Sequence, residues 1–265
     1  MVRNTDAEWK KFGRQDPYYG VLSQDKYRKG NLTPAALREF FDSGRQHMDF
    51  VLATIRRHLD PQFRPRRALD FGCGVGRCLI PMAALTPAAV GLDISEAMLA
   101  EARRNCEQQG VRNIELVLSD DTLSRLTGAF DLAHAILVFQ HIPPARGVAL
   151  FARLVERLAD GGVGVVQVPY HRGVAGAVKA LGALRKHVPL AHNLANLAGG
   201  KPWSEPLMEK NCYDLNRLLR VLQEGRCGRL HVEFQGRGRL LSAILFFQKQ
   251  AGWVPYEPFG EAAPA

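Results

Sequence analysis

Apolar residues in the middle of the chain alternate between short continuous runs and longer stretches with helical spacing. The short runs occupy residues 66–70, 88–92, 114–118, 129–138 and 163–168 and are typical of buried parallel strands. Between them, residues 96–109 and 145–159 repeat apolar positions every three or four residues, as amphipathic helices do. This alternation predicts an α/β fold, with a mostly parallel sheet covered by helices on both faces.

The two ends of the chain have different patterns. Residues 1–65 predict a helical lead-in, in which Thr33 and Pro34 begin a long helix that is interrupted near Ser43 and Gly44. Residues 230–234 and 240–248 flank Gly236 and Gly238 and predict a hairpin. Residues 169–211 are irregular and predict an insertion, and residues 251–265 predict a loosely held tail.

A glycine-rich segment, LDFGCGVGR, follows the first predicted strand. Gly72, Gly74 and Gly76 allow a ligand to approach the backbone closely. The third glycine comes one residue earlier than in the dinucleotide fingerprint, which argues against NAD. Asp93 ends the next predicted strand, 17 positions after Gly76, and its carboxylate can accept hydrogen bonds from two ribose hydroxyls. Together these features indicate a nucleoside ligand at the strand ends.

The pattern formed by Asp70, Gly72, Gly74 and Gly76, with Asp93 one strand later, resembles the class I S-adenosylmethionine-dependent methyltransferase family. The resemblance runs from about residue 66 to residue 168. It implies a Rossmann-like seven-stranded sheet, mostly parallel with a C-terminal antiparallel hairpin, plus helical lid segments. Residues 1–65 would then form the lid, residues 66–250 the methyltransferase domain, and residues 169–211 the acceptor-pocket insertion.

The resemblance also implies a cofactor site. S-adenosyl-L-methionine, with S-adenosyl-L-homocysteine as its product, would be bound by Asp70, Gly72, Gly74, Gly76, Asp93, Ile94 and Asp120. The acid at position 120 would lie near the adenine amino group. The alternative for Asp120 is a carboxylate that caps a turn or a helix.

Methyl transfer mainly requires alignment of the acceptor and removal of its proton. His141, after the fourth predicted strand, is the first candidate for the base, and His171, after the fifth, is the second. A structural histidine bonded to a loop carbonyl is the alternative for each. The candidates for lining the acceptor pocket are Tyr18, Tyr19 and Tyr27 in the lead-in and Tyr170 beside His171. The lead-in tyrosines could instead anchor their segment to the core.

The sequence lacks the residues that several related enzymatic reactions require. A metal-bearing E-x-x-E-H motif would need carboxylates where Leu137 and Gln140 stand, so no bound metal and no metal dependence of the reaction are expected. The loop also lacks the Asn/Asp-Pro-Pro-aromatic motif of adenine amino-methyltransferases and the glutamate of cyclopropane synthases. Pyrimidine C5 transfer needs a nearby cysteine, and none occurs between Cys106 and Cys212. These absences leave oxygen or nitrogen of a small metabolite or saccharide as the acceptor, with O-methylation favoured. N-methylation, or a noncatalytic cofactor-binding regulator, remains the alternative.

Charge and composition change this picture little. The formal net charge of +9 could favour anionic partners, but the basic residues are scattered and form no nucleic-acid-binding motif, so nucleic acid is not expected. The sequence has no apolar run of roughly 20 residues and no apolar core in its charged N-terminus, which predicts no membrane span and a cytoplasmic location. The five cysteines form no CxxC pair and favour free thiols. Nothing in the pattern indicates an oligomeric state.

Overall fold

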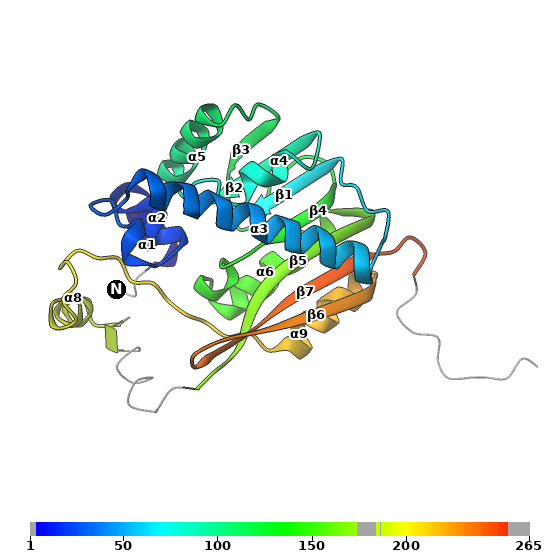
Figure 1. Cartoon of the computed structure of the whole chain (residues 1–265). Helices are drawn as coiled ribbons and strands as arrows, with labels where there is room; N and C mark the ends of the chain where they lie inside the picture. The colour runs from blue at the N-terminus through cyan, green and yellow to red at the C-terminus, as the bar shows by residue number, and fades with distance from the viewer. Residues whose placement is uncertain (1–3, 174–183, 186, 254–265) are drawn as a thin grey trace, which may run out of the picture.

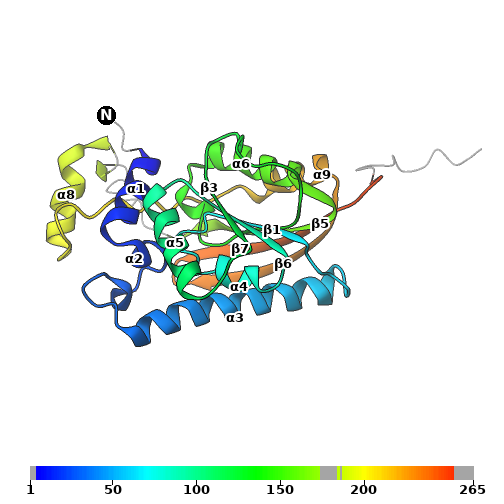
Figure 2. The same ribbon diagram turned by 90° about the horizontal axis from the view of Figure 1, so that it is seen from above.

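A computed structural model describes residues 4–173, 184–185 and 187–253. One seven-stranded sheet lies at the centre, with helices on both of its faces and a group of short helices at one end (Figures 1 and 2). The strands follow the order β3-β2-β1-β4-β5-β7-β6. This arrangement confirms the predicted Rossmann-like methyltransferase sheet.

The first five strands are parallel, and the last two are antiparallel to their neighbours. Their bounds are β1 (Arg67–Phe71), β2 (Ala88–Asp93), β3 (Ile114–Leu118), β4 (Phe130–Ala135), β5 (Leu158–Arg172), β6 (Cys227–Arg237) and β7 (Leu240–Lys249). The predicted C-terminal hairpin is therefore confirmed as β6 and β7. Strand β5 extends well beyond its apolar run, because antiparallel pairing with β7 continues as far as Arg172.

Helices connect the strands and cover the sheet. Their bounds are α1 (Thr5–Gln15), α2 (Pro17–Val21), η1 (Asp25–Tyr27), α3 (Pro34–His58), α4 (Leu79–Ala83), α5 (Glu96–Gln108), η2 (Phe139–His141), α6 (Pro144–Glu156), α8 (Pro189–Ala198) and α9 (Leu215–Glu224). None of the helices in the described part of the chain combines the length and apolar character needed to cross a bilayer. Part of the expected insertion, residues 174–183 and 186, and most of the expected tail lie outside the described residues.

Two apolar cores fill the space on either side of the sheet. On one face, Met48, Val51 and Ile55 of α3 pack against alternate strand residues such as Leu132. On the other face, α6 and α9 pack over a larger cluster that includes Phe151 and Leu218. Because side chains alternate along each strand, neighbouring residues of β4 belong to opposite cores.

The helical lead-in divides into two parts with different positions. The short helices α1 and α2 lie at the end of the sheet, near α8, whereas α3 runs along one face of the sheet (Figure 2). Tyr18 of α2 and Phe40 of α3 join the parts through an edge-to-face ring contact at 5.3 Å. Only the first part can therefore close over the strand ends, and α3 acts as a covering helix.

Helix α3 is continuous, so the predicted interruption near Ser43 and Gly44 is wrong. Gly44 is buried at the point where α3 meets the glycine-rich loop, and a Cβ atom there would lie 1.9 Å from the carbonyl oxygen of Arg77. The glycine is needed for close approach between two segments, and the helix tolerates it because tertiary packing compensates for its low helix propensity.

We expect Gly44→Ala to destabilise the fold by about 2 kcal/mol or more, because the added methyl group meets backbone atoms that no side-chain rotation can move away. The gain in helix propensity, about 1 kcal/mol, is too small to offset this effect. Urea unfolding measures the change. Gly30→Ala is the control, because a Cβ atom at Gly30 meets nothing within 4 Å. Equal stability of the two variants would contradict the proposed contact.

Candidate functional site

The glycine-rich loop between β1 and α4 is shaped by positive φ angles. Gly72, Gly74 and Gly76 have φ values of +74°, +53° and +92°, a region that other residues rarely adopt. A Cβ atom at Gly72 would lie 2.4 Å from the Val138 side chain, and one at Gly74 would lie 2.6 Å from Val21. The loop therefore brings its backbone close to two other segments at the end of the sheet.

Asp93, at the end of β2, is bonded to this loop. Its Oδ2 accepts a hydrogen bond from the Gly74 N–H at 2.9 Å, and its Oδ1 accepts one from the Ser95 N–H at 2.9 Å. Burial raises the pKa of Asp93 to about 6, although these two hydrogen bonds act to lower it. Each carboxylate oxygen keeps further acceptor capacity, which two adjacent hydroxyl groups of a ligand could use.

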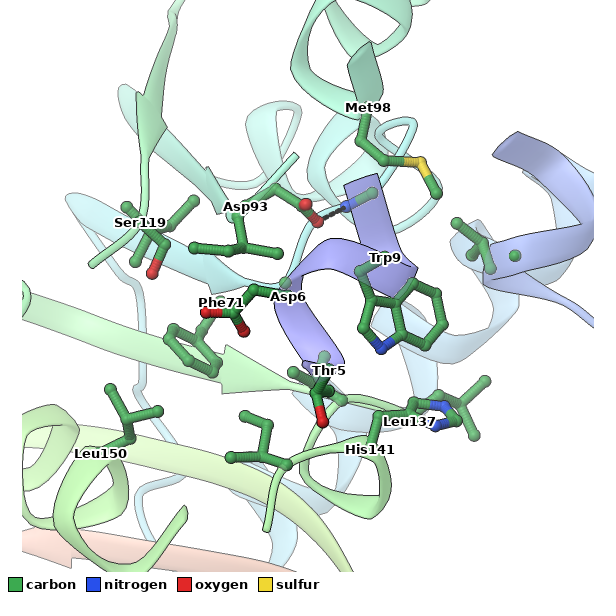
Figure 3. Close-up of a pocket in the computed structure, with 18 of the residues that line it drawn as sticks. Thr5, Asp6, Trp9, Phe71, Asp93, Met98, Ser119, Leu137, His141 and Leu150 are labelled. Atoms are coloured by element: carbon green, nitrogen blue, oxygen red, sulfur yellow. Dashed lines mark hydrogen bonds between the residues drawn. The ribbon is translucent and has the colours of Figure 1, made fainter. Parts of the chain in front are cut away.

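A small cavity of about 110 Å³ lies beside Asp93 and the loop (Figure 3). Of the residues expected to bind the cofactor, Gly72, Gly74, Asp93, Ile94 and Asp120 line it, whereas Asp70 and Gly76 do not. Phe71, Leu92, Met98 and Leu150 contribute apolar side chains. The cavity thus combines an apolar wall with backbone groups and carboxylates.

Helix α1 covers this cavity. Thr5, Asp6 and Trp9 project from α1 toward the strand ends (Figure 3). Arg146 of α6 joins both sides, because its guanidinium binds Asp6 at 2.6 Å and Asp121 at 2.5 Å. The Trp9 ring packs against His141 with the ring centroids 4.7 Å apart. These contacts, together with the buried Phe12 that packs against Val75 and Met98, hold α1 over the cavity.

Asp120 lines the cavity, but its carboxylate is engaged by the turn that follows β3. It accepts hydrogen bonds from the backbone and hydroxyl groups of Thr122 and Ser124 at 2.7 to 3.0 Å. These bonds lower its pKa. These hydrogen bonds are those expected if Asp120 caps a turn. Its position on the cavity wall is the one expected if it binds the cofactor.

Asp70 points under α3, away from the cavity lining. Its Oδ1 accepts a hydrogen bond from Nδ1 of His134 at 2.8 Å, and both side chains are buried. The second nitrogen of His134 lies 2.9 Å from Nε2 of His47 on α3. In the described structure Asp70 thus holds a histidine in place, a contact that the glycine-loop motif does not reveal.

A second, larger cavity of about 1370 Å³ adjoins the first. Gly20, Val21, Leu137 and His141 line both cavities and form their shared rim. Among the described residues, the larger cavity is lined by several amides and cations, including Gln140, Gln167, Asn211, Gln235, Arg172, Arg185 and Lys210. Residues from α2, η2, β5 and the expected insertion meet here.

His141 is buried at the shared rim. Its Nδ1–H donates to the Glu209 carbonyl oxygen at 2.7 Å, and its Nε2 accepts from the Gln140 amide at 2.9 Å. Burial lowers the pKa of His141 to about 4, so the imidazole is neutral at pH 7. The hydrogen bond to the Glu209 carbonyl is the one expected of a structural histidine. The position at the shared rim is the one expected of a catalytic base.

The other residues expected at the acceptor pocket are dispersed. Tyr19 lines the larger cavity under the Arg28 guanidinium, but Tyr18, Tyr170 and His171 line neither cavity. The buried Tyr18 hydroxyl donates to Glu101 and Asn105 of α5, as expected of a tyrosine that anchors the lead-in to the core. Tyr27 is also buried. Tyr170 packs edge-to-face against Phe234, and His171 is exposed.

The sequence-based analysis missed Asp6, Trp9 and Arg146. They lie on α1 and α6, far apart in the chain, and they meet only when the lead-in folds over the strand ends. Acidic residues are common in the first turn of a helix, so Asp6 in the first turn of α1 gives no sign of a role at the site.

The chain resembles known proteins in sequence and in fold. A family model described as a methyltransferase domain matches residues 68–162. The aklanonic acid methyltransferase DauC of Streptomyces sp. (strain C5) is 32% identical over 145 residues, which cover 52% of this chain and 65% of that protein. The 23S rRNA (uracil(1939)-C(5))-methyltransferase RlmD of Burkholderia pseudomallei (strain 1710b) is 30% identical over 159 residues, which cover 56% and 32%.

Among solved structures, magnesium protoporphyrin IX methyltransferase from Synechocystis PCC 6803 with bound SAH has a TM-score of 0.59 at 17% identity. The similarity covers 93% of this chain and 100% of that chain. Residues 68–162 thus match a methyltransferase domain, and the whole described fold is similar to that of a solved S-adenosylmethionine-dependent methyltransferase. It spans less than two thirds of the length of DauC and of RlmD.

We expect Asp93→Ala to weaken binding of S-adenosylhomocysteine roughly tenfold to more than a hundredfold. Loss of hydrogen bonds to a charged acceptor typically costs about 1.5 to 3 kcal/mol. Gly74→Val should also weaken binding, because a branched residue is strained at φ +53°. Titration calorimetry measures both. Asp160→Ala, which alters an exposed carboxylate paired with Arg226, is the control. Wild-type affinity in folded Asp93→Ala and Gly74→Val would refute this binding site.

The buried His141 should also make stability depend on pH. Its pKa lies near 4 in the folded protein, below the usual 6.5, so the unfolded chain binds more protons between these values. Stability therefore falls as pH decreases through this window, by about 2 kcal/mol between pH 7.5 and 5. In His141→Asn, which keeps a donor for the Glu209 carbonyl, this part of the pH dependence should vanish. Urea unfolding at several pH values tests this, and parallel wild-type and variant curves would contradict it.

Proposed function

We propose that this protein transfers a methyl group from S-adenosylmethionine to an oxygen of a small metabolite or saccharide. The observation that carries the proposal is the shared rim between the two cavities. In-line displacement needs donor and acceptor to meet head to head, and a donor beside Asp93 and an acceptor in the larger cavity would meet at Leu137 and His141.

The residues at the small cavity fit the cofactor. The close-packed loop at Gly72 and Gly74 leaves backbone groups accessible to the methionine part, and Asp93 offers acceptors for two ribose hydroxyls. When bound, the cofactor supplies a methyl carbon activated by a sulfonium. Thr5, Asp6 and Trp9 of α1 close one side of this cavity, so α1 would cover a bound cofactor.

We assign the proton acceptor to His141. Its Nδ1–H is committed to the Glu209 carbonyl, which leaves the Nε2 lone pair as the only acceptor on the ring. An acceptor hydroxyl would replace the Gln140 amide as the group that donates to Nε2. A base with a pKa near 4 is weak, but it is sufficient because the hydroxyl proton becomes strongly acidic as the oxygen bonds to the methyl group.

The larger cavity supports a hydroxylated acceptor. Its amide side chains at Gln140, Gln167 and Asn211 can both donate to and accept from hydroxyl groups. Among the described residues neither cavity is lined by a cysteine, the nucleophile that pyrimidine C5 transfer requires. The lining therefore favours a small molecule over an rRNA base, although one relative is named for the latter.

Incubation of the purified protein with isotopically labelled cofactor and a metabolite extract, followed by mass spectrometry, tests the function. We expect one labelled O-methyl product. A labelled N-methyl product would identify the alternative acceptor atom. Cofactor binding without any labelled product from extract, saccharides or hydroxylated acids would favour a noncatalytic regulator.

With the acceptor identified, His141→Ala should lower turnover about 10²- to 10⁴-fold, the usual effect of losing a general base, and leave cofactor affinity nearly unchanged. His171→Ala is the matched comparison, because His171 is the second candidate and lines neither described cavity. Loss of turnover in His171→Ala alone would transfer the role to that residue. Full turnover in both single variants and in the double variant would exclude a histidine base and leave alignment as the mechanism.

A further inference from the structure

Three side chains that can bind a metal meet under α3, outside the two cavities. Nε2 of His47, Nε2 of His134 and Sγ of Cys78 all lie within 4.8 Å of one another. His47 comes from α3, His134 from β4, and Cys78 from the residue that precedes α4. Folding therefore brings together three ligand atoms from separate parts of the chain.

Asp70 fixes the orientation of one ligand. Its carboxylate accepts the Nδ1–H of His134 at 2.8 Å, so the Nε2 lone pair of His134 faces the cluster. A carboxylate that holds the far nitrogen of a metal-binding histidine is a common arrangement at zinc sites. This arrangement gives the buried Asp70 a purpose in the cluster itself.

The two imidazoles are close to the spacing that a shared ion requires. Their Nε2 atoms lie 2.9 Å apart, where the N–H of His47 donates to His134. Two nitrogens at about 2.0 to 2.1 Å from one tetrahedral ion are roughly 3.3 Å apart, so the rings need to separate by only a few tenths of an ångström. The ring planes are inclined by 54° and are therefore not stacked, and modest rotation of the rings would turn both Nε2 lone pairs toward a shared ion.

The chemistry of the ligand atoms also suits a divalent cation. Metal binding would release the proton of the Cys78 thiol, and the resulting thiolate together with the Asp70 carboxylate would balance the charge of the ion. A thiolate and two imidazoles form a ligand set that favours zinc over magnesium or calcium.

A second group in the described structure, His58, His231 and Glu233, lacks these features. Its imidazoles stack at 3.8 Å with an angle of 6° between their planes. Lone pairs that lie in parallel planes cannot both point at one ion between the rings. His58 is also exposed, so this group serves as a control.

We propose that His47, Cys78 and His134 bind one zinc-type divalent cation, with Asp70 as an outer-shell partner. The three ligands leave a fourth position for water. The ion links α3, β4 and the residue after the glycine-rich loop, and so fixes the covering helix to the loop. This proposal departs from the prediction of no metal, which rested on Leu137 and Gln140 in the loop that carries His141 and did not consider the residues that meet under α3.

Metal binding by the full chain tests the proposal. The protein is stripped with a chelator, dialysed against zinc or cobalt(II), and analysed by plasma mass spectrometry and absorption spectroscopy. We expect one bound ion per chain, tetrahedral cobalt bands and a thiolate-to-cobalt charge-transfer band. Cys78→Ser should abolish the charge-transfer band, His47→Ala should abolish stoichiometric binding, and Asp70→Asn should weaken binding about 10- to 100-fold.

His58→Ala should still bind one ion with an unchanged cobalt spectrum. Circular dichroism of each variant establishes that it is folded, and Cys78→Ser is nearly isosteric, so its spectrum is informative even if a histidine variant unfolds. Absence of stoichiometric metal in the wild type, or a cobalt spectrum that Cys78→Ser leaves unchanged, would overturn the proposal. The cluster would then be a hydrogen-bonded chain only.

Discussion

The attachment of the glycine-rich loop to the end of β2 is the constraint on which the rest of the site depends. The N–H groups of Gly72 and Cys73 both donate to the Leu92 carbonyl, at 2.7 and 3.0 Å, and that of Gly74 donates to Asp93. These bonds are possible only with the positive φ angles of the glycines. They set the distance between loop and carboxylate, and with it the floor of the small cavity.

The two faces of this loop have different neighbours. On the cavity side, α2 and the segment after β4 approach it, and Val21 and Val138 pack closely against the glycines. On the other side, α3 contacts Arg77 through Gly44, and Asp70 joins β1 to β4 through His134. A change in the loop therefore reaches both the proposed ligand cavities and the covering helix.

Much of the fold could be predicted from local pattern, because parallel strands and amphipathic helices differ in the period of their apolar residues. The end of β5 could not, since its extension follows from pairing with β7, which is remote in sequence. At the site, the motif leads to Gly72, Gly74, Asp93 and Ile94, which line the small cavity, and also to Asp70 and Gly76, which do not. The roles of Asp6 and Arg146 required knowledge of how α1 folds back.

The bridge that Arg146 makes between Asp6 and Asp121 is only one of the contacts that hold α1 over the small cavity. All three side chains are partly exposed to water, and ion pairs in such surroundings contribute only about 0 to 1 kcal/mol each. The other side of α1 is held by apolar packing, because Phe12 lies in a buried cluster with Val75 and Met98. Dissolved salt screens the exposed ion pairs and leaves apolar packing in place, so a change in ionic strength should loosen only the edge of α1 that faces Asp121.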